Sequence, residues 1–257
     1  MIKLNDVTAG YGGIEIIKDI RIAFEEGGIT TIIGKNGCGK TTLLKTAANL
    51  LKPFRGSITI KGEDISRIPL KEFAKRVAYL PQNRNVPDIT IYQLVMHGRY
   101  PYLGFSDRAG EKDKQIVKNA IETLSLGEYV HENLRKLSGG ERQKAYLAMV
   151  LAQDTDVIFL DEPTTYLDIR HRLEILEIVK KLKEMNKTVV MVLHDLNEAL
   201  TFSDKICLMD RGEVVLYDTP QAVFDSEEIE KIFKVQAEQV FVGDHALRQY
   251  VFYSKTA

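Results

Sequence analysis

A glycine-rich run that ends in a lysine and a threonine is the strongest chemical signal in the sequence. It reads Gly34-Lys35-Asn36-Gly37-Cys38-Gly39-Lys40-Thr41 and matches the P-loop pattern G-x-x-x-x-G-K-[ST]. Glycines let backbone N–H groups surround phosphate oxygens, and the N-terminus of a following helix adds positive potential. We expect these residues and Thr42 to bind a nucleotide, with Lys40 at the β- and γ-phosphates and the Thr41 hydroxyl on Mg²⁺. The alternative is a glycine-rich turn with a stray lysine.

Two adjacent carboxylates, Asp161 and Glu162, follow the apolar run Val157-Ile158-Phe159-Leu160. Ligands of α/β proteins bind at the carboxyl ends of parallel strands, which is where this pair would lie. We expect Asp161 to act on Mg²⁺ and Glu162 to orient or polarise an attacking water. A strand that runs into a polar turn would explain the pair if it stood alone, but the P-loop upstream favours the functional interpretation.

Alternating strand and helix patterns would position these residues. Apolar runs predict strands at residues 2–7, 14–24, 30–33, 57–60, 77–80, 157–160, 189–193, 206–209 and 214–216. Helical periodicity predicts helices at residues 41–49, 112–124, 140–152 and 169–185, with Leu173, Leu176, Val179 and Leu182 on one apolar face of the last. Several strand runs are continuously apolar, as in parallel strands that are covered on both faces. The alternation therefore predicts an α/β fold with βαβ units.

The strand-rich first part of the chain and the helix-rich middle divide this fold. We predict a single domain at residues 1–234, with a core at about 1–82 and 153–234 and a helical insertion at about 83–152. The N-terminal part of the core is expected to be an antiparallel β region. Residues 235–257 would form a small appendage with two short strands, at 240–242 and 250–253.

Composition excludes several classes of protein. The chain has 257 residues, 35 Lys and Arg against 36 Asp and Glu, and a formal net charge of -1, so no basic excess indicates nucleic acid. No apolar stretch approaches the roughly 18–20 residues of a membrane span, and the N-terminus lacks a signal peptide. Cys38 and Cys207 form no disulfide framework. Cys38 could sense redox state at a helix N-terminus, although a small tolerated residue is favoured. We expect a soluble cytoplasmic protein.

A third motif, Leu137-Ser138-Gly139-Gly140-Glu141, lies between the first two. Alone it would be an ordinary turn and helix N-cap. In this order it resembles the signature of ATP-binding-cassette (ABC) ATPases, and the rest of the chain resembles that family nearly throughout. Tyr11 resembles the aromatic that stacks on adenine, Gln82 the glutamine that links core to insertion, and His194 the γ-phosphate sensor. Taken singly, Tyr11 would be a core tyrosine and His194 a structural histidine.

The resemblance implies a P-loop (RecA-like) ABC ATPase core that hydrolyses Mg-ATP. It implies catalytic roles for Glu162, His194 and Gln82, with Gln82 also a metal ligand beside Thr41 and Asp161. Such domains form head-to-tail dimers in which ATP lies between two protomers. Ser138, Gly139 and Gly140 would then contact ATP held by the second copy, and the run Pro163-Thr164-Thr165-Tyr166-Leu167-Asp168 would contact the opposite subunit.

Two segments resemble one group of importers, the ATPases that serve ferric-siderophore, haem and cobalamin uptake. They are His97-Gly98-Arg99-Tyr100-Pro101-Tyr102-Leu103-Gly104 and the Thr-Thr-Tyr-Leu-Asp run. The resemblance implies polytopic permease subunits docked near Tyr100 and Tyr102, an indirect link to a substrate-binding protein, and a peripheral place on the inner face of the membrane. An ordinary Pro-containing loop is the alternative for the first segment. The group often has Pro at Lys35 and Ser at Thr41. A soluble iron–sulfur assembly ATPase is the rival function.

Overall fold

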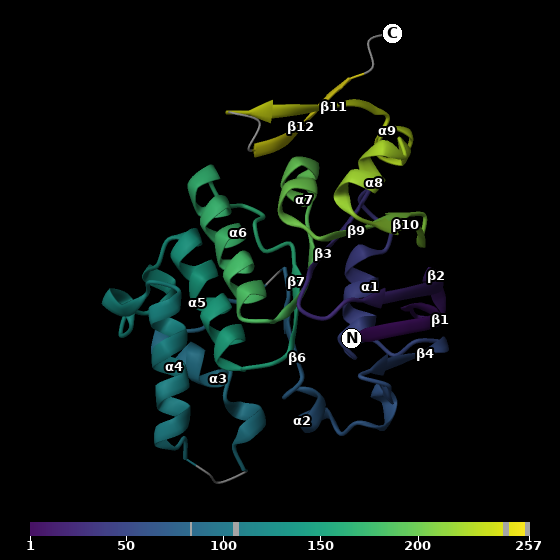
Figure 1. Ribbon diagram of the computed structural model, residues 1–257. Coiled ribbons are helices and arrows are strands. Elements are labelled where there is room, and N and C mark those ends of the chain that lie inside the picture. The colour runs from purple at the N-terminus through teal and green to yellow at the C-terminus, as the bar shows by residue number, and fades with distance from the viewer. Residues whose placement is uncertain (83, 105–107, 244–246, 255–257) are drawn as a thin grey trace. The chain divides into compact units, whose positions relative to one another are not determined.

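The computed structural model describes residues 1–82, 84–104, 108–243 and 247–254 and divides into two compact units (Figure 1). The first unit contains Met1–Arg67 and Thr188–Ala257, and the second contains Ile68–Lys187. The predicted start of the helical insertion, Asn83, lies outside the described residues, as do residues 105–107 of the insertion and 244–246 and 255–257 of the appendage. The predicted domain boundaries stay a prediction.

An antiparallel sheet opens the first unit. Its strands follow the order β2-β1-β4-β5 and are β1 (Ile2–Tyr11), β2 (Ile14–Phe24), β4 (Arg55–Ile60) and the short β5 (Glu63–Asp64). Neighbouring strands all pair antiparallel. One face carries fully buried side chains such as Leu4, Ile17 and Ile58. The predicted N-terminal antiparallel region is therefore confirmed.

A second sheet in this unit is mainly parallel. In it β10 (Glu213–Asp218), β9 (Lys205–Asp210), β3 (Ile29–Gly34) and β8 (Thr188–Val192) lie side by side in that order. Strand β3 is parallel to both β8 and β9, while β10 is antiparallel to β9. Every residue of β3 and β8 is buried, because both faces of these strands are covered. Strand β3 ends at Gly34 and thus delivers the P-loop at its carboxyl end.

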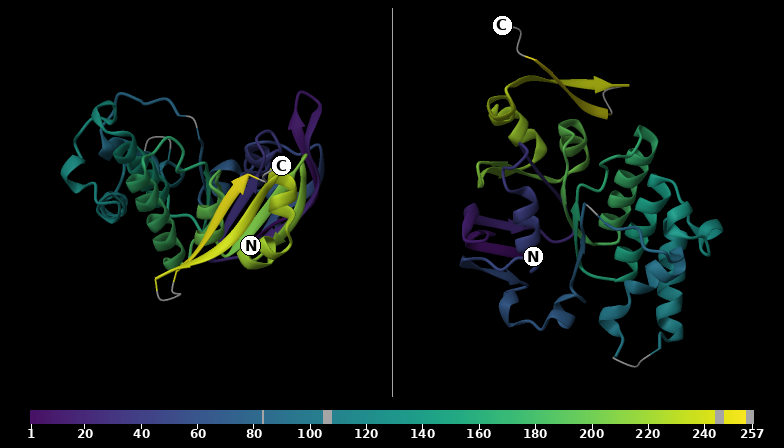
Figure 2. Two further views of the ribbon diagram at one scale, coloured as in Figure 1. Left: turned by 90° about the horizontal axis from the view of Figure 1, so that it is seen from above. Right: turned by 180° about the vertical axis from the view of Figure 1, so that it is seen from behind.

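Short helices and a hairpin complete the first unit. Helix α1 (Lys40–Ala47) and the turn η1 (Ile65–Arg67) come early, and α7 (Leu196–Phe202), α8 (Pro220–Asp225) and α9 (Glu228–Phe233) come late. The hairpin of β11 (Val235–Val242) and β12 (Leu247–Ser254) lies with β12 against α7 (Figure 2). The two strands predicted at the C-terminus therefore exist and are longer than expected. Tyr250 of β12 is buried.

The second unit is mostly helical. Its strands β6 (Val77–Leu80) and β7 (Val157–Asp161) pair in parallel. Its helices are α2 (Leu70–Phe73), α3 (Ile91–His97), α4 (Glu111–Thr123), α5 (Gly139–Ala152) and α6 (Ile169–Glu184), with single turns η2 (Tyr100–Tyr102), η3 (Gly127–Tyr129) and η4 (Leu134–Lys136). Helices α3, α4 and α5 pack on one another, and α5 also packs on β6.

The predicted apolar face of α6 is wrong at Leu173. That side chain is 48% exposed, whereas Leu176, Val179 and Leu182 are buried. Residues three apart advance about 300° around a helix with 3.6 residues per turn, so positions spaced by three drift around it. Leu173 consequently lies almost opposite Leu182, and the buried face is completed by Ile175 and Ile178 instead.

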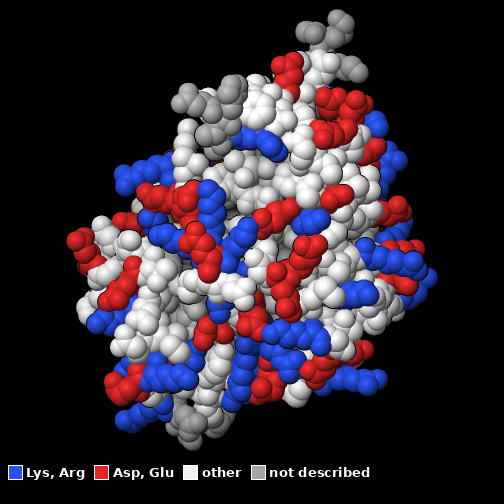
Figure 3. Space-filling model, viewed as in Figure 1, with Lys and Arg blue, Asp and Glu red and all other residues white. Residues whose placement is uncertain are grey.

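Within the described ranges, no helix combines the length and apolar character that crossing a bilayer requires. On the face shown in Figure 3, Lys and Arg side chains are interspersed with Asp and Glu. The coloured residues of that face form no broad region of one sign. Their mixture accords with the formal net charge of -1.

Candidate functional site

The P-loop connects β3 to α1 in the first unit. Lys40 is only 6% exposed, and its Nζ donates to the backbone carbonyls of Gly34 at 2.8 Å and Lys35 at 3.0 Å. The ammonium is therefore folded back on its own loop and its charge is satisfied by peptide dipoles. Gly39 lies at the N-cap of α1 with φ 104°, in the left-handed region that favours glycine. The loop and the first turn of α1 thus present backbone N–H groups for an anion.

Close packing explains the glycine at position 34. A Cβ there would lie 2.3 Å from the carbonyl oxygen of Met209 and 2.7 Å from the Sγ of Cys38, so the loop closes against β9. Cys38 is itself buried, and burial raises the pKa of its thiol despite the nearby charge of Lys40. A raised pKa is the opposite of what a redox-sensing thiolate needs, which favours the interpretation of Cys38 as a small packing residue.

Tyr11 and His194 belong to the same unit as the P-loop. Tyr11 is the last residue of β1 and is 48% exposed, so its ring is not the core tyrosine that its strand-end position would otherwise suggest. An exposed aromatic ring of this kind can stack on a planar base. His194 is exposed and follows β8, the parallel neighbour of β3. Tyr11 thus ends a strand of the antiparallel sheet, and the P-loop and His194 follow two parallel neighbouring strands.

The carboxylate pair and Gln82 meet directly in the second unit. The Nε2 of Gln82 donates to Oε2 of Glu162, and the Thr165 hydroxyl donates to the same oxygen at 3.0 Å. Asp161 is only 3% exposed and accepts a 3.1 Å hydrogen bond from the Tyr79 hydroxyl. Because β6 and β7 are parallel, Gln82 and Glu162 leave the sheet at the same edge. The structure thus places Gln82 in contact with Glu162, at the end of the strands where Asp161 also lies.

The backbone at Glu162 is unusual. Its φ is 52°, in the left-handed region, although the residue is not glycine. Such a conformation costs a non-glycine residue roughly 1–2 kcal/mol. Strain of this kind is concentrated at functional sites, where the surroundings hold it in place. Glu162 therefore turns sharply out of β7 rather than continuing the strand.

The signature motif forms the start of α5. Ser138 is the N-cap, with its hydroxyl accepting from the N–H of Glu141 at 3.3 Å, and the Glu141 carboxylate accepts from the N–H of Ser138 at 2.9 Å. This capping box leaves the N–H groups of Gly139 and Gly140 in the first turn, where an anion would be favoured. A Cβ on Gly140 would lie 2.0 Å from Cδ2 of His171, so a side chain there would require the His171 ring of α6 to move.

The predicted residues therefore fall into two groups. The P-loop, Thr42, Tyr11 and His194 lie in the first unit. Gln82, Asp161, Glu162 and the signature residues lie in the second. The sequence did not predict that Tyr79 and Thr165 contact the carboxylates. It also did not predict the contacts of Gln143 with Arg84 and Pro163. Tyr79 could have been found from the pairing of its strand with β7, but the other contacts depend on how loops close in space.

The segment expected to dock on a permease contains two exposed tyrosines that differ in their contacts. Tyr100 is 57% exposed, with its ring 4.7 Å from that of His97. The Tyr102 ring instead lies 3.9 Å from the guanidinium carbon of Arg99, and its hydroxyl donates to the carbonyl of Gln153 at 3.0 Å. Tyr102 is thus held by contacts within its unit, while both tyrosines keep exposed surface.

Arg99 anchors this segment. It is 4% exposed, its Nε donates to Asp113 at 2.9 Å, and its Nη1 donates to the carbonyl of Ala152 at 2.9 Å. Burial opposes ionisation of Asp113, but hydrogen bonds from Arg99 and Gly110 and the Arg99 charge hold the pKa of Asp113 below its ordinary value. The pair therefore stabilises the fold when both groups are charged.

Replacing Arg99 by methionine should lower the free energy of unfolding by about 3 kcal/mol at pH 7, because the partly buried Asp113 carboxylate loses its buried partner and the Ala152 carbonyl loses a donor. The loss should shrink below about pH 4. A carboxyl with a depressed folded-state pKa stabilises the fold above its unfolded-state pKa and loses that contribution as pH falls. Urea unfolding followed by circular dichroism at pH 7 and pH 3.5 measures both effects. Arg135→Met, which breaks an exposed pair with Asp88, is the control and should stay within about 0.5 kcal/mol. An equal loss at both pH values would contradict the role of the ion pair.

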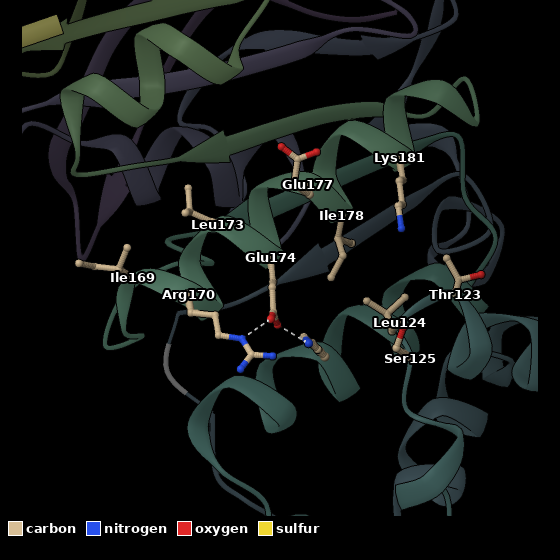
Figure 4. A pocket seen from close by; sticks show the side chains of 11 residues that line it. Thr123, Leu124, Ser125, Ile169, Arg170, Leu173, Glu174, Glu177, Ile178 and Lys181 are labelled. Carbon is tan, nitrogen blue, oxygen red and sulfur yellow. Dashed lines mark hydrogen bonds and ion pairs between the residues drawn. The ribbon is translucent and has the colours of Figure 1, made fainter. Parts of the chain in front are cut away.

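A groove of about 870 Å³ lies elsewhere in the second unit, between α6 and the ends of α4 and α5 (Figure 4). Ile169 and Leu173 line it. Glu174 forms ion pairs with Arg170 on its own helix and with Lys144 on α5. No residue predicted from the sequence to bind nucleotide or metal lines this groove. The groove is thus distinct from the residues that the sequence predicts to bind nucleotide.

The donor set suits Mg²⁺ better than a transition metal. Thr41 offers a hydroxyl, Gln82 a carbonyl oxygen and Asp161 a buried carboxylate, and hard oxygen ligands are those Mg²⁺ prefers. Across the described residues no cluster of three or more His, Cys, Asp or Glu side chains could hold a metal by itself. Mg²⁺ commonly binds through one or two protein groups together with phosphates, and each unit by itself offers such groups, Thr41 in the first and Gln82 and Asp161 in the second.

Comparison with known proteins agrees with this geometry. The ABC transporter family model matches residues 17–165. The petrobactin import ATP-binding protein FpuD of Bacillus anthracis is 41% identical over 90% of this chain and 86% of its own length. The iron(3+)-hydroxamate import ATP-binding protein FhuC of Bacillus subtilis is 40% identical over 90% of this chain and 87% of its own. A solved dimeric ATP-binding cassette in a post-hydrolysis state with ADP and Pi superposes with a TM-score of 0.75 at 28% identity, over 86% of this chain and 99% of that one. Since the family model spans more than half of the chain and both relatives align over nearly all of it, the chain belongs to the ABC transporter family.

Proposed function

We propose that this chain is the ATP-hydrolysing subunit of an ABC importer that takes up a metal chelate of the ferric-siderophore, haem or cobalamin type. The hydrolytic part is carried by one observation, the Glu162 carboxylate held by Gln82 and Thr165 beside buried Asp161. The transport part draws on relatives that are import proteins for petrobactin and iron(3+)-hydroxamate.

ATP binding is assigned to the P-loop and Tyr11. Lys40 would exchange the carbonyls of Gly34 and Lys35 for oxygens of the β- and γ-phosphates. The phosphates would lie against backbone N–H groups of the loop and of the first turn of α1. The exposed ring of Tyr11 would stack on adenine. The residues of this site are Gly34, Lys35, Asn36, Gly37, Cys38, Gly39, Lys40, Thr41 and Thr42.

Hydrolysis is assigned to Glu162 with support from Gln82 and His194. Glu162 would accept a proton from water as the water oxygen bonds to the γ-phosphorus and the bond to the β–γ bridging oxygen breaks, releasing ADP and phosphate. Gln82 would hold that carboxylate and the water in place, and His194 would contact the γ-phosphate. Thr41, Gln82 and Asp161 would hold Mg²⁺, which when bound neutralises charge on the phosphates.

A second copy of the chain would complete the site. Ser138, Gly139 and Gly140 begin α5 with N–H groups that favour an anion, and they would contact the γ-phosphate of ATP held by the other protomer in a head-to-tail dimer. The dimeric cassette with ADP and Pi supports this arrangement.

Membrane subunits are the other proposed partners. The chain would bind polytopic permease subunits through the surface around Tyr100, which is exposed, and would contact a substrate-binding protein only indirectly. It would thereby lie peripherally on the inner face of the cell membrane. No nucleic acid takes part in this function.

Uptake in the host cell tests the proposal. Deleting the gene should abolish uptake of at least one labelled cargo in a panel of ferric hydroxamate, ferric catecholate, ferric petrobactin, haem and cobalamin, and a plasmid copy should restore it. A polytopic membrane protein should also copurify with the chain from detergent-solubilised membranes. Unchanged uptake of the whole panel would contradict the importer role.

A further inference from the structure

Two sets of polar contacts adjoin Glu162 in the second unit. Gln82 contacts Glu162 directly. Arg84 contacts Gln143 on α5, and Gln143 in turn contacts the backbone of Pro163, the residue directly after Glu162. The second set thus joins the segment that contains Arg84, the signature helix α5 and the end of β7.

Gln143 uses both ends of its amide and is 8% exposed. Its Nε2 donates to the Pro163 carbonyl at 2.6 Å, and its Oε1 accepts from Nη2 of Arg84 at 2.5 Å. A carbonyl can only accept and a guanidinium can only donate, so these two partners determine the orientation of the amide. Only a glutamine at this position makes both bonds from one planar group.

Arg84 is fixed to α5 by a second contact. Its guanidinium carbon lies 4.2 Å from the centre of the Tyr146 ring, and the Tyr146 hydroxyl donates to the carbonyl of Asn85 at 3.0 Å. The Nη1 of Arg84 is buried and finds no hydrogen-bond acceptor in the described part of the chain. Burial lowers the pKa of the guanidinium to about 10. A residue needed only for packing would avoid this cost, so Arg84 calls for a functional explanation.

The position of Gln143 on α5 links these contacts to the signature. Gln143 lies about one helical turn after Gly139 and Gly140, so a shift of the first turn of α5 carries Gln143 with it. That motion would act on Pro163 directly, through its hydrogen bond from Gln143. Pro163 follows Glu162, whose backbone is held in the left-handed region.

We propose that Gln143 is a positioning residue that couples the placement of α5 to the geometry of Glu162. Arg84 supports it by holding the Gln143 amide in its orientation. This inference rests on the proposed function, since Glu162 must be the group that activates water. When the signature of α5 engages ATP, Gln143 holds the Pro163 backbone so that Glu162 faces the nucleophile. Without that bond Glu162 still binds Gln82, but its position no longer follows the position of α5.

Steady-state ATPase kinetics test the coupling. Gln143→Met keeps the side-chain length and removes both bonds, and its kcat should fall about tenfold with KM for ATP within about twofold, the pattern of a lost transition-state interaction. Gln143→Glu can still accept from Arg84 but has no donor for Pro163, so its kcat should fall comparably. Arg84→Met should give a smaller loss of kcat. The double variant should lose less than the product of the single losses, because Arg84 acts through Gln143.

Matched measurements separate positioning from damage. Gln115→Met makes the same substitution on an exposed face of α4 and should leave kcat unchanged. The ATP-binding stoichiometry of each variant gives its folded fraction, and a kcat loss that disappears after this correction would overturn the proposal. If the wild type is active and kcat is unchanged in both Gln143→Met and Gln143→Glu, the proposal would also be overturned. Arg84→Met supplies the same test if the Gln143 variants do not fold. A wild type without ATPase activity would instead refute the proposed function.

Discussion

Replacing Glu162 by glutamine should reduce ATP turnover about 100-fold or more while leaving ATP binding intact. Removal of a general base typically costs about two to four orders of magnitude. The amide keeps the shape of the side chain, and its oxygen can still accept from Gln82 and Thr165, so the local contacts survive. With hydrolysis blocked, the ATP-bound dimer should persist. Phosphate release measures the turnover, and size-exclusion chromatography with light scattering measures the dimer.

The control for this variant is Glu177→Gln, which makes the same change on an exposed side chain of α6. It should hydrolyse ATP at the wild-type rate and dimerise only transiently. Near-normal turnover of Glu162→Gln would show that another group activates the water. Failure of Glu162→Gln to bind ATP would show that the substitution disturbs the site more widely than its contacts predict.

Replacing Lys40 by methionine should raise the dissociation constant of ATP about 100-fold, which corresponds to roughly 2.7 kcal/mol. Lys40 is the buried cation of the P-loop, and charge-assisted bonds to phosphate oxygens are among the stronger protein contacts. Methionine fills the space of the aliphatic stem, so the loop should keep its fold. Fluorescence titration with a labelled ATP analogue measures the affinity.

Lys52→Met is the matched control, because Lys52 is exposed and lies outside the loop. Its affinity for the analogue should equal that of the wild type. A Lys40→Met variant that binds equally well would contradict the assignment of Lys40 to the phosphates. A lower melting temperature in both variants would indicate a general effect of the added methionine.

The parts of the site that come from contiguous residues can be predicted from the sequence. The P-loop pattern requires a strand before it and a helix after it, and β3 and α1 supply them. The run before Asp161 is apolar throughout because β7 is buried on both faces, which placed the carboxylates at a strand end. In both cases the local residue types determine the local structure.

The contacts between segments could not be predicted in the same way. The bonds of Gln143 to Arg84 and Pro163 join residues far apart in sequence, and no periodicity records them. The contacts of Tyr102 with Arg99 and the carbonyl of Gln153 likewise join segments that no sequence pattern connects. Short helices such as α7 and α8 depend on their N-caps, Asp195 and Thr219, more than on an apolar stripe, so periodicity overlooks them.

The left-handed backbone of Glu162 sets stability against activity at that position. Glycine or asparagine would adopt the same φ at lower cost, so the residues that suit the backbone best are ones without a carboxylate. Either substitution should therefore relax the backbone while removing the proposed base, a trade-off between stability and activity. The proposed role of Glu162 would explain why a residue poorly suited to this backbone occupies the position.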